Sequence, residues 1–135
     1  MLIGEILLTG ETTNLIRNIN SGSSSISFKL SAFKNTNPYS QEIQKVQLAY
    51  LFQIEVYNQN GVLLNIDNLQ IPVMIKIRKT KNIQFSREKV FGRYWDNGWK
   101  SGGVEDHRLL MTDNYFFVFA DHLAPFSVFY LPYES

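Results

Sequence analysis

Both histidines of the chain directly follow acidic residues. Asp121-His122 could form an acid–base pair, because an imidazole exchanges protons near neutral pH. Glu105-Asp106-His107 presents three side chains of the kind that bind divalent metals. A metal site needs three or four convergent ligands, which consecutive residues do not provide alone. The sequence therefore predicts no metal site, a solvated loop at 105–107, and a hydrogen-bonded His122 at a strand edge.

Three aromatic residues, Tyr94, Trp95 and Trp99, lie close together in a glycine-rich segment over residues 94–103. Exposed aromatic rings stack on sugar rings in carbohydrate-binding sandwiches, and Trp and Tyr often anchor protein interfaces. Both Trp side chains could instead fill one end of a β-sandwich. We take these three residues as the candidate binding residues, with burial of both Trp as the alternative.

The basic residues do not form a phosphate-binding pattern. A short basic run consists of Lys76, Arg78, Lys79 and Lys81. Lys76 and Arg78 alternate with apolar residues and so belong to the outer face of a strand. The chain has 13 Lys and Arg against 12 Asp and Glu, a formal charge of +1. Neither this balance nor the glycine spacing after Trp95 favours nucleic-acid or nucleotide binding.

The composition indicates one folded domain over residues 1–135. Apolar residues make up 44% of the chain and aromatic residues 14%, which is enough for a packed core without metal or disulfide. There is no cysteine, so thiol catalysis and Cys-type zinc sites are excluded. The apolar start contains Glu5 and lacks a basic segment, and no run approaches the roughly 20 residues that span a bilayer. We therefore expect no signal peptide, no membrane span and cytoplasmic synthesis.

Alternation of apolar and polar residues with period two predicts β-strands throughout. Asn60-Gly61 predicts a tight hairpin turn in which both residues tolerate positive φ, and Pro72 suits a strand entry. The predicted strands cover residues 1–9, 26–30, 52–57, 62–64, 73–78, 115–120 and 126–131. Residues 32–44 are predicted to form a loop, and residues 41–47 one helical turn. The fold class is an all-β antiparallel sandwich, jelly-roll-like or immunoglobulin-like, with at most one short helix.

The order of features over residues 50–131 resembles the C-terminal half of the GAIN domain, which ends in the GPCR-proteolysis-site (GPS) motif. An Asn-Leu-x-x-Pro-Val strand, here residues 68–73, precedes a Tyr-Trp-Asp loop with a second Trp, here from Tyr94 to Trp99. The motif then closes with His-Leu-Thr/Ser-x-Phe-Ala-Val, against His122-Leu123-Ala124-Pro125-Phe126-Ser127-Val128. The GPS-like segment covers residues 91–131, and a GAIN-like sandwich is the fold that the resemblance implies.

Two departures from this motif concern its chemistry. The paired cysteines of the family are missing, so the aromatic core must supply the stability of those bridges. The resemblance implies self-cleavage by a hydroxyl after His-Leu, with the His as base, but Ala124 has no hydroxyl. Ser127 lies three residues too late to attack the Leu123 carbonyl. His122, Leu123 and Ala124 therefore mark a degenerate cleavage motif.

The predicted function is a non-enzymatic structural or protein-interaction domain without a cofactor, resembling a cleavage-incompetent GAIN/GPS module. The strands around Phe117 and Phe129 carry large residues on both faces, which indicates a second covering surface. This favours protein partners in a larger assembly, in which the chain would be a small subunit. One alternative is a minor structural protein of a viral capsid or other particle. The other is a carbohydrate-binding module that uses the loop of Trp95 and Trp99.

Overall fold

Eleven strands and one α-helix make up most of the chain that the structure describes. The structure is a computed structural model and describes residues 2–19, 26–33, 46–80 and 86–131. The elements in chain order are β1 Gly4–Leu7, α1 Gly10–Ile19, β2 Ile26–Phe33, β3 Val46–Gln47, β4 Leu51–Asn58, β5 Leu63–Leu64, β6 Val73–Arg78, η1 Arg87–Lys89, β7 Val90–Trp95, β8 Trp99–Lys100, η2 Asp106–Arg108, β9 Leu110–Met111, β10 Tyr115–Ala120 and β11 Pro125–Tyr130.

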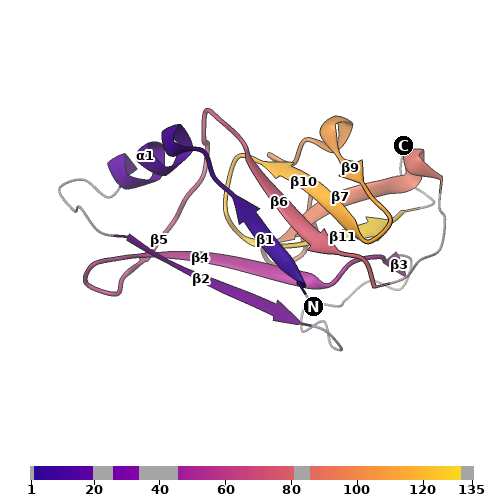
Figure 1. Ribbon diagram of the computed structural model, residues 1–135, viewed down its shortest axis with the longest axis horizontal. Coiled ribbons are helices and arrows are strands. Elements are labelled where there is room, and N and C mark those ends of the chain that lie inside the picture. The colour runs from indigo at the N-terminus through magenta and orange to yellow at the C-terminus, as the bar shows by residue number, and fades with distance from the viewer. Residues whose placement is uncertain (1, 20–25, 34–45, 81–85, 132–135) are drawn as a thin grey trace.

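The strands form two antiparallel sheets. The smaller sheet has the order β1-β6-β10-β9, and the larger has the order β2-β4-β11-β7-β8, with β3 beside β11 and β5 beside β4. Figure 1 shows β1, β6 and β10 side by side, running at an angle to β2 and β4 of the other sheet. This arrangement confirms the predicted all-β antiparallel sandwich-like fold.

The main core lies between the two sheets. On β6, the side chains of Val73, Ile75 and Ile77 are buried and those between them are half-exposed. On the other sheet, Ile54 and Val56 of β4 belong to the same buried cluster. Apolar residues at alternate strand positions point to one face, so each sheet contributes one apolar face to this core.

Strand β11 is buried on both faces. Phe126 and Val128 belong to the main core, and Phe129 belongs to a second buried cluster with Trp99, Leu51 and Leu131. The expected covering of this aromatic strand therefore comes from within the chain.

A corner at residues 48–50 joins the two sheets. Leu48 donates its backbone N–H to Val128 of β11, and Tyr50 donates to Arg78 of β6. The hydroxyl of Ser127, which is fully buried, donates to the Ala49 carbonyl at 3.0 Å. A buried hydroxyl needs such a partner, because leaving it unpaired costs about 1–3 kcal/mol. Ser127 therefore fastens β11 to the corner.

The helix α1 was not predicted at its position. Residues 10–19 are helical because Thr9 caps the first turn, its Oγ1 accepting the Thr12 N–H at 3.1 Å. Thr12 and Ile16 lie one turn apart and are both buried. The polar and apolar residues of this segment thus follow the helical period, which the reading of the sequence as uniformly β overlooked.

Two further predictions about the first half of the chain were wrong. The helical turn predicted at 41–47 is wrong at its C-terminal end, because Val46–Gln47 form β3 and pair with Phe129 and Tyr130. Residues 41–45 lie outside the described residues. Residues 32 and 33, predicted as loop, complete β2, because they continue its pairing with β4. Backbone pairing in the sheet outweighed the local propensity in both places.

The hairpin between β4 and β5 forms, but its turn differs from the predicted one. Only Gly61 has positive φ, at 77°, and its N–H donates to the Asn58 carbonyl at 3.0 Å. The Asn58 side chain also accepts the N–H groups of Asn60 and Val62, at 2.9 and 3.0 Å. This side chain holds a longer turn with one glycine in the left-handed region, in place of a two-residue turn.

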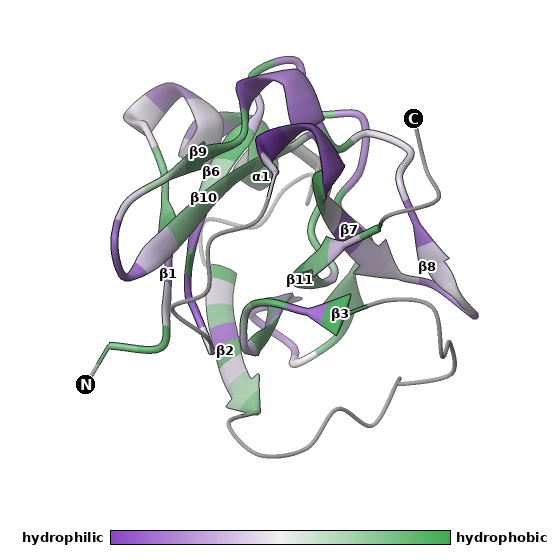
Figure 2. Cartoon of the chain, turned by 90° about the vertical axis from the view of Figure 1, so that its right-hand side faces the viewer, coloured by the Kyte–Doolittle hydropathy of each residue, from purple (hydrophilic) through white to green (hydrophobic). Residues whose placement is uncertain are grey.

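Strand β2 carries the predicted alternation, which appears as bands of hydropathy in Figure 2. Ile26 and Phe28 pack against the main core, whereas Leu30 is 47% exposed although it pairs with the buried Ile54. An edge strand has a neighbour on one side only, so part of its apolar face stays uncovered.

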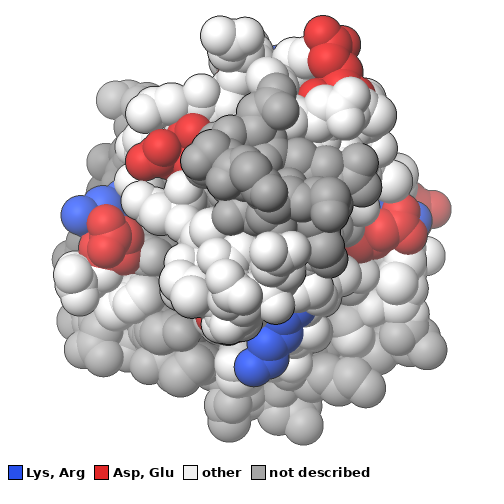
Figure 3. Space-filling model, turned by 90° about the vertical axis from the view of Figure 1, so that its left-hand side faces the viewer, with Lys and Arg blue, Asp and Glu red and all other residues white. Residues whose placement is uncertain are grey.

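The surface at the α1 end of the molecule carries charges of both signs, scattered among uncharged residues (Figure 3). No helix within the described residues is long and apolar enough to cross a membrane.

Replacement of Phe126 by Ala should lower the free energy of unfolding by about 3–5 kcal/mol, since its ring is fully buried in the main core. The matched control is Leu110→Ala on β9, where the side chain is 58% exposed and the expected change is within about 0.5 kcal/mol. Urea denaturation followed by fluorescence measures both. Equal effects would contradict the described core.

Candidate functional site

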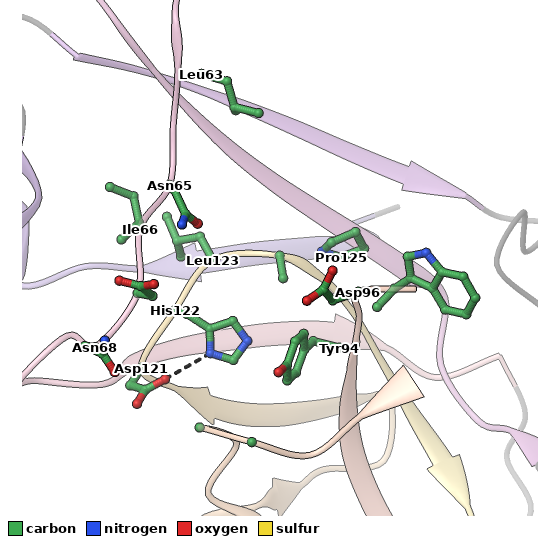
Figure 4. A pocket seen from close by; sticks show the side chains of 15 residues that line it. Leu63, Asn65, Ile66, Asn68, Tyr94, Asp96, Asp121, His122, Leu123 and Pro125 are labelled. Carbon is green, nitrogen blue, oxygen red and sulfur yellow. Dashed lines mark hydrogen bonds and ion pairs between the residues drawn. The ribbon is translucent and has the colours of Figure 1, made fainter. Parts of the chain in front are cut away.

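A cleft of about 720 Å³ lies at one end of the sandwich, where four segments of the chain meet. These are the connection from β5 to β6, the end of β7 with its turn, the glycines after β8, and the connection from β10 to β11 (Figure 4). The lining residues are Leu63, Asn65, Ile66, Asp67, Asn68, Tyr94, Trp95, Asp96, Gly102, Gly103, Asp121, His122, Leu123, Ala124 and Pro125.

Backbone hydrogen bonds hold the walls of the cleft together. Leu69 donates to the Asp121 carbonyl at 2.7 Å, and Leu123 donates to the Ile66 carbonyl at 3.0 Å. Between these two bonds Asp67 and Asn68 are exposed, and Asn68 has a positive φ of 52°. Asn tolerates this conformation better than most residues, because its short polar side chain can bond locally. Backbone hydrogen bonds therefore join the two connections into one wall of the cleft.

His122 makes the predicted hydrogen bond, but it is packed away from solvent. Its Nδ1 lies 2.9 Å from Asp121 Oδ1, and its side chain is 12% exposed. The ring lies edge-on to Tyr94, with ring centroids 4.2 Å apart, and tilted against Phe126 at 5.6 Å. When the Asp121 carboxylate is ionised it only accepts, and Nδ1 is then the donor of this hydrogen bond. Nε2 is buried without a hydrogen-bond partner among the described residues.

Gly103 completes this arrangement. Its φ is +75°, and a Cβ there would overlap the Asp121 carboxylate and come within 2.9 Å of His122 Nδ1. Its carbonyl accepts the Asp121 N–H at 3.0 Å. Only glycine combines this backbone conformation with this close approach. The glycine-rich segment after Trp99 thus closes over the Asp121-His122 pair.

The three candidate aromatic residues do not share one environment. Trp99 is buried, edge-on to Phe129 at 4.7 Å between ring centroids, and it does not line the cleft. Tyr94 and Trp95 are half-buried and both line the cleft. Trp95 meets Trp99 edge-on at 5.5 Å. Trp99 is therefore a core residue, whereas Trp95 is only partly buried and packs against the same cluster of buried residues.

The contact between the two Trp rings follows from a hairpin at a segment that the sequence predicted as a loop. Trp95 and Trp99 pair across β7 and β8. The turn between them contains Asn97 and Gly98 with φ of 55° and 141°, and Asp96 donates to the Gly98 carbonyl at 2.9 Å. Asn97-Gly98 thus has the two positive φ angles that were expected at Asn60-Gly61.

Glu105-Asp106-His107 fastens the sandwich and does not converge on a metal. Asp106 Oδ2 accepts from Arg93 at 2.8 Å, and Asp106 Oδ1 accepts the Gly92 N–H at 2.8 Å. Glu105 pairs with Arg108 at 3.0 Å. No group of three potential metal ligands occurs within the described residues. Residues 105–107 are thus not simply a solvated loop, because Asp106 has a structural role.

The basic run has the predicted position on an outer sheet face. The Lys76 ammonium lies 4.3 Å from the centroid of the Tyr115 ring, and the Arg78 guanidinium lies 5.5 Å from it. Such contacts stabilise a cation over an aromatic face. Lys81 lies outside the described residues.

The residues of the degenerate cleavage motif form part of the cleft wall. Leu123 and Ala124 are half-buried, and the Ala124 carbonyl accepts the Ile54 N–H at 3.3 Å. Ser127, the nearest hydroxyl downstream of Ala124 in the sequence, donates to the Ala49 carbonyl at 3.0 Å. The arrangement offers no hydroxyl at the position that cleavage requires.

Sequence reasoning missed the polar lining of the cleft. Asn65, Asp67 and Asn68 come from the β5–β6 connection and Asp96 from the β7–β8 turn, and all four are exposed. The first three share one sequence signal, which is their position between the predicted strands 62–64 and 73–78. Arg93 was also missed, because a buried arginine is rare unless it is paired.

No known protein family, curated protein or solved structure matches the chain. Fold and site together define it as an all-β sandwich-like protein with a polar, partly aromatic cleft at one end.

Replacement of Asp106 by Asn should lower the free energy of unfolding by about 3 kcal/mol, because it removes a carboxylate that pairs with the buried Arg93 guanidinium. Glu105→Gln is the control, since the pair with Arg108 is solvent-exposed and contributes about 0.5 kcal/mol or less. Thermal and urea unfolding measure both variants. If the two variants lost the same stability, Asp106 would not have the role assigned to it.

Proposed function

We propose that this chain is a non-enzymatic interaction domain that binds a partner through the cleft between residues 65–68, 94–96 and 121–125. The observation that carries the proposal is the cleft itself, whose walls are fixed by the hydrogen bonds Leu69–Asp121 and Leu123–Ile66. A site that is rigid before binding loses less conformational entropy on binding. Such a preformed polar surface suits recognition.

The state of His122 supports a binding role over catalysis. Its Nε2, the ring nitrogen that Asp121 does not engage, is buried without a hydrogen-bond partner among the described residues. A general base must be within hydrogen-bond reach of the proton that it removes. Together with Ala124 in place of a hydroxyl residue, this supports the proposal that the chain is similar to a cleavage-incompetent GAIN/GPS module.

The rim of the cleft supports a macromolecular partner. Val62 and Leu63 are each 56% exposed, and Leu63 lines the cleft and also a smaller adjoining hollow of about 350 Å³. Exposed apolar side chains beside a polar cleft are typical of protein interaction sites.

A role as a subunit of a larger particle has less support than partner binding at the cleft. The particle role was expected because two strands carry large residues on both faces, which would require a covering surface. On β11 that second face is covered by Trp99 and Leu51 of the same chain. On β10, Phe119 lies under the Arg108 guanidinium, which is 4.3 Å from the ring centroid. The partner is therefore sought at the cleft end.

The purified chain should remain one species of 15.7 kDa during long incubation at neutral pH, with or without hydroxylamine, which would trap an ester intermediate. The variant Ala124→Ser should also stay intact, because His122 Nε2, the ring nitrogen that Asp121 leaves free to take a proton, is buried and has no hydrogen-bond partner among the described residues. Intact mass spectrometry checks both. A break after Leu123 in the unmodified chain would overturn the non-enzymatic assignment.

A photo-reactive amino acid in place of Leu63 should form cross-links to the partner in an extract of the native source, because this position lies on the rim of the cleft. The matched position is Leu110 on β9, which is about as exposed at 58% but does not line the cleft. Mass spectrometry identifies the conjugates. Equal labelling at both positions, or labelling at Leu110 alone, would contradict partner binding at the cleft.

A further inference from the structure

We infer that the cleft recognises an uncharged carbohydrate carried by the partner. This inference rests on the proposed function and names the chemical class of the group that is bound. It follows from the charge, the hydrogen-bonding groups and the apolar surfaces that line the cleft.

The charge of the lining selects against anions. Three carboxylates, those of Asp67, Asp96 and Asp121, line the cleft, and no Lys or Arg is among the described lining residues. Lys100 approaches Asp96 at 3.8 Å, but both side chains are at least half exposed, so this pair is weak. A sulfated, sialylated or phosphorylated group would therefore meet uncompensated negative charge.

The lining offers both hydrogen-bond donors and acceptors. Carboxylates only accept, whereas the Asn65 and Asn68 amides and the Tyr94 hydroxyl both donate and accept. A sugar hydroxyl also does both, so it can bond to either kind of group. A lysine or arginine side chain only donates, and it would leave the amide and hydroxyl donors without a partner. A lining with both hydrogen-bond donors and acceptors thus favours a ligand with hydroxyl groups over a cationic ligand.

The spacing of the three carboxylates also favours a ligand with hydroxyl groups over a cation. They do not gather into a group that could hold a metal ion within the described residues. Figure 4 shows Asp96 beside Pro125 and Tyr94, and Asp121 on the opposite side of His122. Acceptors distributed along a cleft match a ligand with several separated hydroxyl groups.

The apolar part of the lining suits the C–H faces of a sugar ring. In Figure 4, Tyr94 stands on one side of the cleft, and Leu123 and Pro125 lie between it and the β5–β6 connection. Trp95 also lines the cleft. Aromatic rings next to polar groups bind ligands that are apolar on one face and polar at the edge. The cleft combines these surfaces with the donors and acceptors described above.

The test measures binding of the full chain to a glycan array that contains neutral oligosaccharides and their sulfated and sialylated counterparts. Hits are followed by isothermal titration calorimetry. We expect neutral glycans to bind, and Asp96→Asn and Trp95→Ala each to weaken binding about tenfold or more. The control is Asp113→Asn, an exposed carboxylate in the turn before β10 that does not line the cleft, and it should leave the affinity unchanged. Circular dichroism verifies that each variant is folded.

Three outcomes overturn the inference: no neutral glycan binds, binding is confined to anionic glycans, or Asp113→Asn weakens binding as much as Asp96→Asn. A parallel titration with a lysine- and arginine-rich peptide distinguishes failure of the carbohydrate inference from failure of the proposed binding at the cleft. If this peptide binds in a manner lost in Asp96→Asn while neutral glycans do not bind, the carbohydrate inference falls and the proposed function stands. If the purified chain is cleaved after Leu123, the proposed function itself falls.

Discussion

The structure depends on the burial of β11 on both of its faces. Phe126 and Val128 of this strand fill the core between the sheets, and Phe129 fills the second cluster with Trp99. The strand also pairs with β7 on one side and with β4 and β3 on the other. A strand with apolar neighbours on every side tolerates little displacement, because protein interiors are close-packed. The segments at its two ends are therefore fixed in position.

The cleft is a direct consequence of that constraint. The chain must pass from β10 in the smaller sheet to β11 in the larger one within residues 121–124. This short connection places His122 against Phe126 and brings Asp121 under Gly103. Its backbone groups are satisfied by Ile66 and Leu69 from the connection between β5 and β6. The polar side chains at the crossing stay outside the core, and they line the cleft.

A second constraint is the buried Arg93, which lies on β7 beside β11. Its guanidinium pairs with Asp106, and the same carboxylate bonds to the Gly92 backbone. Gly92 packs against Val118 and Val104, where a Cβ would come within 3.1 and 3.2 Å of their methyl groups. The segment with Asp106 is thereby attached to the larger sheet, and the glycines after Trp99 are held over the cleft. Residues that resemble a metal-binding cluster in the sequence thus serve the architecture.

The sequence by itself determined the all-β class, the strands around Val73–Arg78, Tyr115–Ala120 and Pro125–Tyr130, and the missing hydroxyl at Ala124, because side-chain period and residue type are local properties. It missed α1, whose cap at Thr9 is short and polar, and it assigned the two positive φ angles to the wrong Asn-Gly pair. Only the tertiary structure decided that Trp99 is core while Trp95 faces the cleft, that Asp106 pairs with Arg93, and that Asp67, Asp96 and Asp121 share one surface. These relations join residues far apart in the chain, and the packing of two sheets around β11 fixes them.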